Sequence, residues 1–278
     1  MIPFEFDYYR PETLHEAASL YQKLQLEGKQ PFIFSGGTEL MTLGRIGLAN
    51  TEAVIDIKEI AECRVMQING NHLELGSTLT LTQIEEANLF PLLTKTASEV
   101  ADHTARGKIT LGGNICARIF YRETVLPFLL ADSQVLLAGP DGKRIVPINT
   151  IFQGQLQLNK NEFLVQVATE RRYLSAPYFV VKRRQQWDTG YPLITLAALK
   201  TGQGIRVAIS GLCPFPFRSR EVEGAINEQG LSVQSRIEGA IAALPKPILD
   251  DVEGSADYRL FVLRNLLVDA LSTLESIV

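Results

Sequence analysis

Two pairs of adjacent glycines, each flanked by polar side chains, are the residues of this chain best suited to bind a ligand. The first lies in Ser35-Gly36-Gly37-Thr38-Glu39 and the second in Thr110-Leu111-Gly112-Gly113-Asn114. Glycine tolerates positive φ and lets the backbone approach a ligand closely. Successive N–H groups in such a turn form a concave anion site. No basic cluster lies beside either pair, so backbone dipoles would provide most of the binding of the two phosphates of a dinucleotide.

Each glycine pair taken alone also fits an ordinary turn, because the chain has 21 glycines. Neither pair belongs to a G-x-G-x-x-G or G-x-x-x-x-G-K-[ST] pattern, so the sequence does not support a Rossmann or P-loop site. The sequence also lacks a G-x-S-x-G elbow and any clear pairing of a nucleophile with a base. We therefore predict a binding site and assign no catalytic residue.

The composition argues against several other kinds of site. The 278 residues carry 27 basic and 31 acidic side chains, a net charge of −4, which argues against nucleic-acid binding. The apolar runs are far shorter than a membrane span and no signal peptide is recognisable at the start, so we expect a cytoplasmic protein that does not enter a membrane. The three histidines lack metal-ligand spacing. The scattered cysteines predict neither a disulfide framework nor an iron–sulfur cluster held by this chain alone: Cys63, Cys116 and Cys213.

The elements that must position the first glycine pair alternate between strand and helix signals. Residues 13–26 have apolar side chains at helical spacing. Residues 31–34 read as a short buried strand that stops at the glycines, and residues 53–57 read as a second strand. This rhythm indicates a small parallel or mixed sheet.

The second glycine pair lies in a segment of different character. Two strands, residues 63–69 and 72–76, flank a turn at Gly70-Asn71. Residues 82–85 fit a capping box that should open a helix, and a second helix is expected over residues 92–100. Three strands follow the glycines, at residues 134–138, 144–148 and 163–168.

The last third of the chain reads as a further unit that begins near residues 171–176. Antiparallel strands are expected first, at residues 178–182, 193–198 and 205–209. Helices then dominate, and the last is long and amphipathic; they are expected at residues 219–227, 235–243 and 258–277.

Both glycine pairs lie in motifs that resemble those of one known family. Residues 35–40 resemble the A-G-G-T-[DE]-L motif of the flavin domain in molybdenum hydroxylases, the family of xanthine dehydrogenase and aerobic carbon monoxide dehydrogenase. Residues 110–115 resemble the T-[IL]-G-G-N-[IL] motif of the same family. Further similarities follow along nearly the whole chain, at residues 76–78, Arg106, residues 182–184 with Asp188, residues 216–221 and residues 254–259.

The resemblance implies an α+β fold. It is the two-subdomain flavin-binding fold of the vanillyl-alcohol oxidase type, followed by a C-terminal α+β domain with an antiparallel sheet and helices. The expected FAD-binding domain is 1–172, with subdomains of about 1–60 and 61–172, and the C-terminal flavoprotein domain is 173–278. FAD would lie between the subdomains, with its pyrophosphate on the two glycine segments.

The resemblance also implies individual FAD contacts. Glu123 matches an acidic residue that faces the adenosine part, and Leu164 matches an apolar contact to the flavin ring region. Lys182 matches a lysine near the isoalloxazine, where its charge would favour reduced, anionic flavin. The remaining contacts come from the two glycine segments: Ile33, Phe34, Ser35, Gly36, Gly37, Thr38, Glu39, Leu40, Thr110, Leu111, Gly112, Gly113 and Asn114.

One segment departs from the family pattern. Residues 115–123 lack the family's Ser-Pro, and glutamate replaces the usual aspartate. Arg118 and Arg122, within this segment, either contact the cofactor or a partner subunit, or are solvated. His103 fits a loop hydrogen-bonding role better than an acid–base role, and Trp187 fits packing better than shielding of the flavin.

The function implied by the resemblance is an FAD-carrying electron-transfer subunit of a molybdenum hydroxylase of the xanthine dehydrogenase type, acting in purine catabolism. A large partner subunit would hold molybdopterin and a small partner subunit would hold 2Fe-2S clusters. FAD would pass the electrons to NAD or another acceptor. Two alternatives remain open: a stand-alone flavin oxidoreductase of the same fold, and a non-catalytic binding module with vestigial glycine segments.

Overall fold

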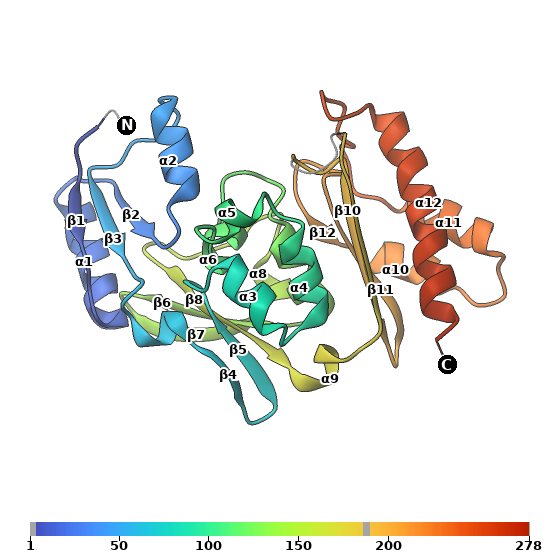
Figure 1. The fold of residues 1–278 in the computed structure, drawn as a ribbon, viewed down its shortest axis with the longest axis horizontal. Coiled ribbons are helices and arrows are strands. Elements are labelled where there is room, and N and C mark those ends of the chain that lie inside the picture. The colour runs from blue at the N-terminus through green and yellow to red at the C-terminus, as the bar shows by residue number, and fades with distance from the viewer. Residues whose placement is uncertain (1–3, 186–189, 278) are drawn as a thin grey trace.

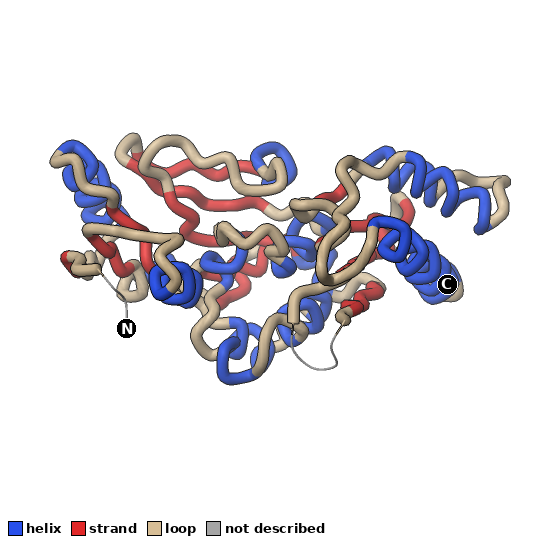
Figure 2. The backbone as a smooth tube through the Cα atoms, turned by 90° about the horizontal axis from the view of Figure 1, so that it is seen from above, coloured by secondary structure: helices blue, strands red, loops and turns tan. Residues whose placement is uncertain are grey.

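The computed structural model describes residues 4–185 and 190–277. Its strands form three sheets that follow one another along the longest axis of the molecule, in chain order (Figure 1). The N-terminus and the C-terminus lie toward opposite ends of the molecule in both Figure 1 and Figure 2. Helices accompany every sheet, so the predicted α+β class is confirmed.

The first sheet has three strands, and all of its pairings are parallel. Its order is β1-β3-β2, formed by Asp7–Tyr9, Ala53–Asp56 and Pro31–Phe34. Helix α1 (Leu14–Leu26) connects β1 to β2, and the Thr13 side chain caps this helix by accepting the N–H of Glu16. Helix α2 (Thr38–Arg45) follows β2 almost directly. The sequence predicted a small sheet that is either parallel or mixed, and the observed sheet is parallel.

The middle sheet has five strands that pair in antiparallel fashion. Its order is β4-β5-β8-β6-β7, formed by Met66–Asn69, His72–Gly76, Phe163–Glu170, Gln134–Gly139 and Gly142–Pro147. Helices α3, α4, α6 and α7 pack with this sheet into one buried apolar cluster; they are Leu81–Ala87, Pro91–Ser98, Leu111–Ile115 and Leu126–Leu130. The short helix α5 (His103–Arg106) precedes α6 and buries Arg106. Short turns complete this part, namely η1 (Ala61–Arg64), η2 (Glu123–Val125), α8 (Ile148–Ile151) and α9 (Arg171–Leu174).

Two local predictions in this part are wrong. The first strand of the hairpin begins at Met66 instead of residue 63, because the preceding residues form the turn η1. The capping box is formed by Thr80 and Gln83, two residues before the expected position. Both positions satisfy the sequence rule for a capping box. The observed one lets α3 bury Leu81 and Ile84, so core packing selects the start of the helix.

The third sheet is antiparallel and is buried on both faces. Its order is β12-β11-β10-β9, formed by Phe217–Arg218, Gly204–Ser210, Ile194–Thr201 and Tyr178–Arg183. Successive residues of β10 alternate between two cores, because side chains of a strand point to opposite faces: Ala197 joins the middle core and Ala198 joins the C-terminal core. Helices α10 to α12 form the C-terminal core with this sheet (Figure 1); they are Arg220–Ile226, Val233–Ala242 and Ala256–Glu275. Among the described helices, none is long and apolar enough to cross a membrane.

Candidate functional site

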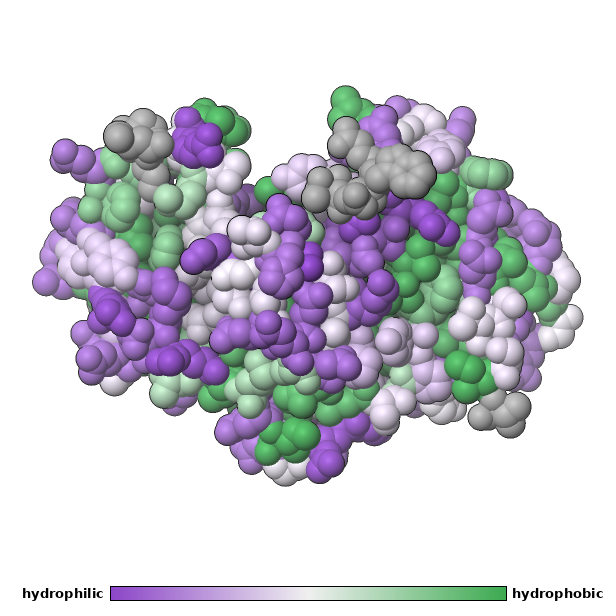
Figure 3. Space-filling model, in the orientation of Figure 1, coloured by the Kyte–Doolittle hydropathy of each residue, from purple (hydrophilic) through white to green (hydrophobic). Residues whose placement is uncertain are grey.

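A cavity of about 710 Å³ lies where the first sheet, the middle helices and the third sheet meet. This volume lies in the range typical of small-molecule and cofactor sites. Figure 3 shows that the molecular surface is indented between α2 and the C-terminal part. Fourteen of the sixteen residues that the sequence indicated as FAD contacts line this cavity: Ile33, Ser35, Gly36, Gly37, Thr38, Glu39, Leu40, Thr110, Gly112, Gly113, Asn114, Glu123, Leu164 and Lys182.

The other two indicated residues support the site from outside the cavity. The ring of Phe34 lies directly behind Gly37, where a Cβ atom would be 2.0 Å from a ring atom. The ammonium of Lys58 lies 4.5 Å from the centre of the same ring. Leu111 is fully buried in the middle core. Phe34 and Leu111 therefore fix the two glycine segments, while their neighbours line the cavity.

A single buried hydroxyl joins the two glycine segments. The Oγ1 atom of Thr110 accepts hydrogen bonds from the hydroxyl of Ser35 (2.8 Å) and from the N–H of Gly36 (3.2 Å). It also accepts the N–H of Gly113 at 3.3 Å. Thr110 is only 2% exposed, so these bonds are shielded from water. Segments that are 74 residues apart in the chain thus form one wall of the cavity.

The glycines are required by the close approach of these segments to each other and to the core. A Cβ atom on Gly36 would lie 2.2 Å from the carbonyl oxygen of Lys108, and a Cβ atom on Gly112 would lie 2.6 Å from Cβ of Ser77. Gly37 has φ +68°, a left-handed conformation that other residues rarely adopt. The first glycine segment could therefore not take this path with larger residues.

The two glycine segments differ in what they offer an anion. The N-cap of α2 is Gly37, which has no side chain, and no described residue accepts the N–H groups of Thr38 and Glu39 in the first turn, so these groups can face a ligand. In the second segment, the N–H groups of Leu111 and Gly112 already donate to the carbonyl oxygens of Leu79 and Ser77. The first segment thus provides the open N–H groups, at the positive end of a helix, and the second segment mainly holds it in place.

Asn114 adds a further donor to this wall of the cavity. Its Oδ1 atom accepts the N–H of Thr124 (3.2 Å) and the hydroxyl of the same residue (2.6 Å). The amide NH₂ of Asn114 is therefore the part that can donate to a ligand. Free N–H groups at a helix N-terminus and a neighbouring amide donor are the chemistry that a pyrophosphate requires, so this wall fits that group.

A buried ion pair forms another wall of the same cavity. The ammonium of Lys182 lies 2.7 Å from Oε2 of Glu123, and the two side chains are 2% and 6% exposed. The hydroxyl of Thr195 donates to the other carboxylate oxygen at 2.5 Å, and Lys182 also donates to the carbonyl oxygen of Glu99 at 2.9 Å. Every member of this network therefore has a partner, as burial of charge requires.

This ion pair corrects two sequence interpretations. Glu123 was expected at the adenosine part of FAD and Lys182 at the isoalloxazine, which are opposite ends of the cofactor. The two side chains touch, so they belong to the same end. The ammonium of Lys182 also has a charge partner within the protein, the carboxylate of Glu123; its expected effect on the flavin stays a prediction.

The atypical segment after Asn114 is held by the chain itself. The carboxylate of Glu39 accepts the N–H groups of Arg118 and Ile119, both at 2.8 Å. Arg122 is buried and donates to the carbonyl oxygens of Ala117 and Gly154, both at 2.6 Å. Of the two arginines in this segment, Arg122 is thus held by backbone carbonyl groups and also lines the cavity, whereas Arg118 is exposed.

Several residues of the cavity were missed by sequence reasoning. Their apolar or aromatic side chains look like ordinary core residues in the sequence, and only the course of the chain brings them here: Tyr21, Phe32, Val100, Ala101, Ile109, Tyr121, Leu158, Phe163 and Tyr191. The rings of Tyr121 and Tyr191 stack with centres 4.7 Å apart. Burial raises the pKa of Tyr121 to about 12, so this phenol is neutral at physiological pH. His103 does not line the cavity, and Trp187 and Asp188 lie outside the described residues.

Comparison with known proteins identifies the family. Residues 4–169 match the family described as "FAD binding domain in molybdopterin dehydrogenase". The chain belongs to this family. The match covers both glycine segments and Glu123, so the N-terminal part of this chain is an FAD-binding domain.

Individual relatives resemble this FAD-binding chain over most of their length. The carbon monoxide dehydrogenase medium chain of Hydrogenophaga pseudoflava is 28% identical, with 93% of each chain covered. The xanthine dehydrogenase FAD-binding subunit of Escherichia coli O157:H7 is 26% identical, with 92% of this chain and 89% of the relative covered.

Solved structures show the same fold. A carbon monoxide dehydrogenase structure from Hydrogenophaga pseudoflava has a TM-score of 0.88 at 24% identity and covers 99% of each chain. A quinoline 2-oxidoreductase structure from Pseudomonas putida 86 has a TM-score of 0.84 at 21% identity, again over 99% of each chain. At these identities the comparison establishes the fold, which agrees with the flavin-binding fold implied by the sequence motifs.

Proposed function

We propose that this FAD-binding chain is the electron-transfer subunit of a molybdenum hydroxylase of the xanthine dehydrogenase type. The observation that carries the proposal is one cavity that combines free N–H groups at the start of α2 with the buried pair of Glu123 and Lys182. The family supports FAD as the ligand, and the relatives' names, "medium chain" and "FAD-binding subunit", support a role within a larger assembly. We place the FAD-binding domain at 1–172 and the C-terminal domain at 173–278, and the assembly in the cytoplasm.

The residues of the cavity divide into two binding regions in this proposal. The start of α2, with Gly37 to Glu39, and the amide of Asn114 bind the pyrophosphate. The pair of Glu123 and Lys182 binds the imide edge of the flavin, which has one N–H donor between two carbonyl acceptors. The ammonium has three donors and two are used within the protein, so one remains for a flavin carbonyl. Each oxygen of the Glu123 carboxylate likewise keeps a lone pair for the imide N–H.

The bound FAD would supply the redox chemistry, accepting electrons from 2Fe-2S clusters of a small partner subunit and passing them to NAD or another acceptor. A large partner subunit would carry molybdopterin and hydroxylate the organic substrate, for which we propose a purine. The chain's own contribution is to hold the cofactor and to exclude water from its flavin end, where Leu164 and Val100 provide apolar surface.

The complex purified with untagged partners from its native host tests this proposal. Acid treatment should release FAD intact, because no residue for covalent attachment is evident, and the complex should oxidise a purine and reduce an acceptor. This chain alone, loaded with FAD, should not oxidise the purine. Release of FMN or of no flavin, or vigorous purine oxidation by the chain alone, would contradict the proposal. Absence of any released flavin would favour a non-catalytic binding module. Purine oxidation by the chain alone would favour a stand-alone oxidoreductase.

A further inference from the structure

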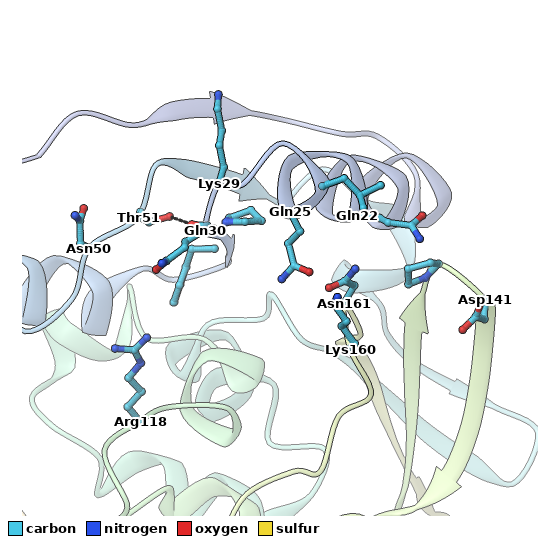
Figure 4. A pocket seen from close by; sticks show the side chains of 14 residues that line it. Gln22, Gln25, Lys29, Gln30, Asn50, Thr51, Arg118, Asp141, Lys160 and Asn161 are labelled. Carbon is cyan, nitrogen blue, oxygen red and sulfur yellow. Dashed lines mark hydrogen bonds between the residues drawn. The ribbon is translucent and has the colours of Figure 1, made fainter.

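A second cavity of about 550 Å³ lies beside α1 and the first sheet (Figure 4). Pro31 and Phe32 line both cavities. Three other segments pass from one cavity to the other at neighbouring positions. On α1, Tyr21 lines the FAD cavity and Gln25, one helical turn later, lines the second cavity. Likewise, Glu162 and residue 117 line the FAD cavity, whereas their neighbours Asn161 and residue 118 line the second cavity. The second cavity is therefore an extension of the first, on the opposite side from the third sheet, to which Lys182 belongs.

Two buried amide oxygens in this extension have no hydrogen-bond partner in the described part of the chain. They are Oε1 of Gln25 and Oδ1 of Asn161. Figure 4 shows the side chain of Gln25 directed from α1 toward Asn161. Asn161 is 9% exposed and has φ +65°, a conformation that asparagine tolerates better than most residues. Buried acceptors without donors cost stability, and a ligand that donates hydrogen bonds here would satisfy both oxygens.

We propose that Gln25 and Asn161 bind the exocyclic amino group of the adenine ring of FAD; this inference rests on the proposed function. The amino group has two N–H donors, one for each unpartnered oxygen. A carboxamide side chain also matches the adjoining ring nitrogen of adenine, as it does when Asn or Gln recognises adenine. Phe32, at the junction of the two cavities, offers an aromatic surface on which a purine stacks.

The adenine site lies beyond the part of the cavity that flavin and pyrophosphate occupy in the proposal. In the proposal, Glu123 and Lys182 bind the flavin and α2 binds the pyrophosphate. The adenine ring, at the other end of FAD, is bound by Gln25 and Asn161. This arrangement makes the extension the determinant of FAD over FMN, because FMN has no adenine. It also replaces Glu123 as the adenosine contact that the sequence indicated.

The test uses the full chain freed of flavin and titrates it with three ligands. These are FAD, FMN and flavin hypoxanthine dinucleotide, in which an oxygen replaces the amino group. Flavin fluorescence gives each Kd. We expect the hypoxanthine analogue to bind about 10-fold more weakly than FAD, because its oxygen would face two acceptors. Gln25→Met and Asn161→Gly should each weaken FAD binding about 10-fold and leave FMN binding unchanged. The control Gln234→Met, at an exposed residue of α11 that lines neither cavity, should change neither affinity.

The outcomes distinguish this inference from the function on which it rests. Equal affinity of the unaltered chain for FAD and for the hypoxanthine analogue would overturn the adenine site and leave the FAD proposal standing. Unchanged FAD affinity in folded Gln25→Met and Asn161→Gly would do the same. Absence of any flavin binding by the unaltered chain would overturn both. If a variant fails to fold, the Kd values of FAD and of the hypoxanthine analogue on the unaltered chain still test the adenine site.

Discussion

The replacement of Lys182 by methionine tests the buried ion pair most directly. Methionine keeps the apolar length of the side chain and removes the ammonium. The carboxylate of Glu123, 6% exposed, then loses its charged partner and keeps only the hydroxyl of Thr195. Removal of one member of a buried ion pair costs about 3–5 kcal/mol, because the other charge stays buried without compensation. This loss is a large fraction of the roughly 5–15 kcal/mol that stabilises a typical protein.

The double variant Lys182→Met/Glu123→Gln should recover most of this stability. Glutamine can still accept the hydrogen bond from Thr195, and no unpaired charge remains in the interior. Urea unfolding of the wild type, the two single variants and the double variant gives a double-mutant cycle, and we expect a coupling of about 2–3 kcal/mol. A cost below about 1 kcal/mol for Lys182→Met, or additive effects in the cycle, would refute the reasoning. Flavin titration of the double variant then shows how much the pair contributes to binding.

Three further predictions follow from contacts around the site. Thr110→Val removes the hydroxyl that joins the glycine segments, so FAD should bind about 10-fold more weakly and urea unfolding should show a loss of about 1–3 kcal/mol. The control Thr94→Val removes a buried hydroxyl that has no hydrogen-bond partner among the described residues, so it should change little; equal effects of the two variants would contradict the assignment of Thr110. Gly36→Ala places Cβ 2.2 Å from a backbone oxygen and should lower both FAD affinity and the urea midpoint, whereas Gly224→Ala meets open space and should not. A hydrogen bond from the guanidinium of Arg144 lowers the pKa of Glu162 below its ordinary value of 4.5. The bond therefore stabilises the protein above pH 4.5, and this contribution is lost as the pH falls below that value. Arg144→Met should flatten the dependence of the unfolding free energy on pH below 4.5, and identical pH dependences of variant and wild type would exclude the effect.

Local patterns determined much of the fold in advance. Helix α1 starts within one residue of its expected position, and β2 covers the expected residues 31–34. Apolar spacing and caps act over a few residues, so the sequence alone fixes them. Where two local solutions were available, as for the capping boxes at Thr80 and Thr82, only the packing of Leu81 and Ile84 in the core decided between them.

The motifs also indicated most of the candidate site but not its internal arrangement. Both glycine segments were visible from spacing, and their assignment to one ligand depended on the family resemblance. The sequence does not show that Thr110 bonds Gly36, 74 residues away, or that Lys182 bonds Glu123, 59 residues away. Nor does it separate cavity residues such as Val100 from core residues such as Leu93, since both are apolar. Residue types and local spacing, together with the family resemblance, thus indicated that this chain binds a dinucleotide. Its tertiary structure decided which charges meet, because the partner of a buried charge depends on the whole path of the chain.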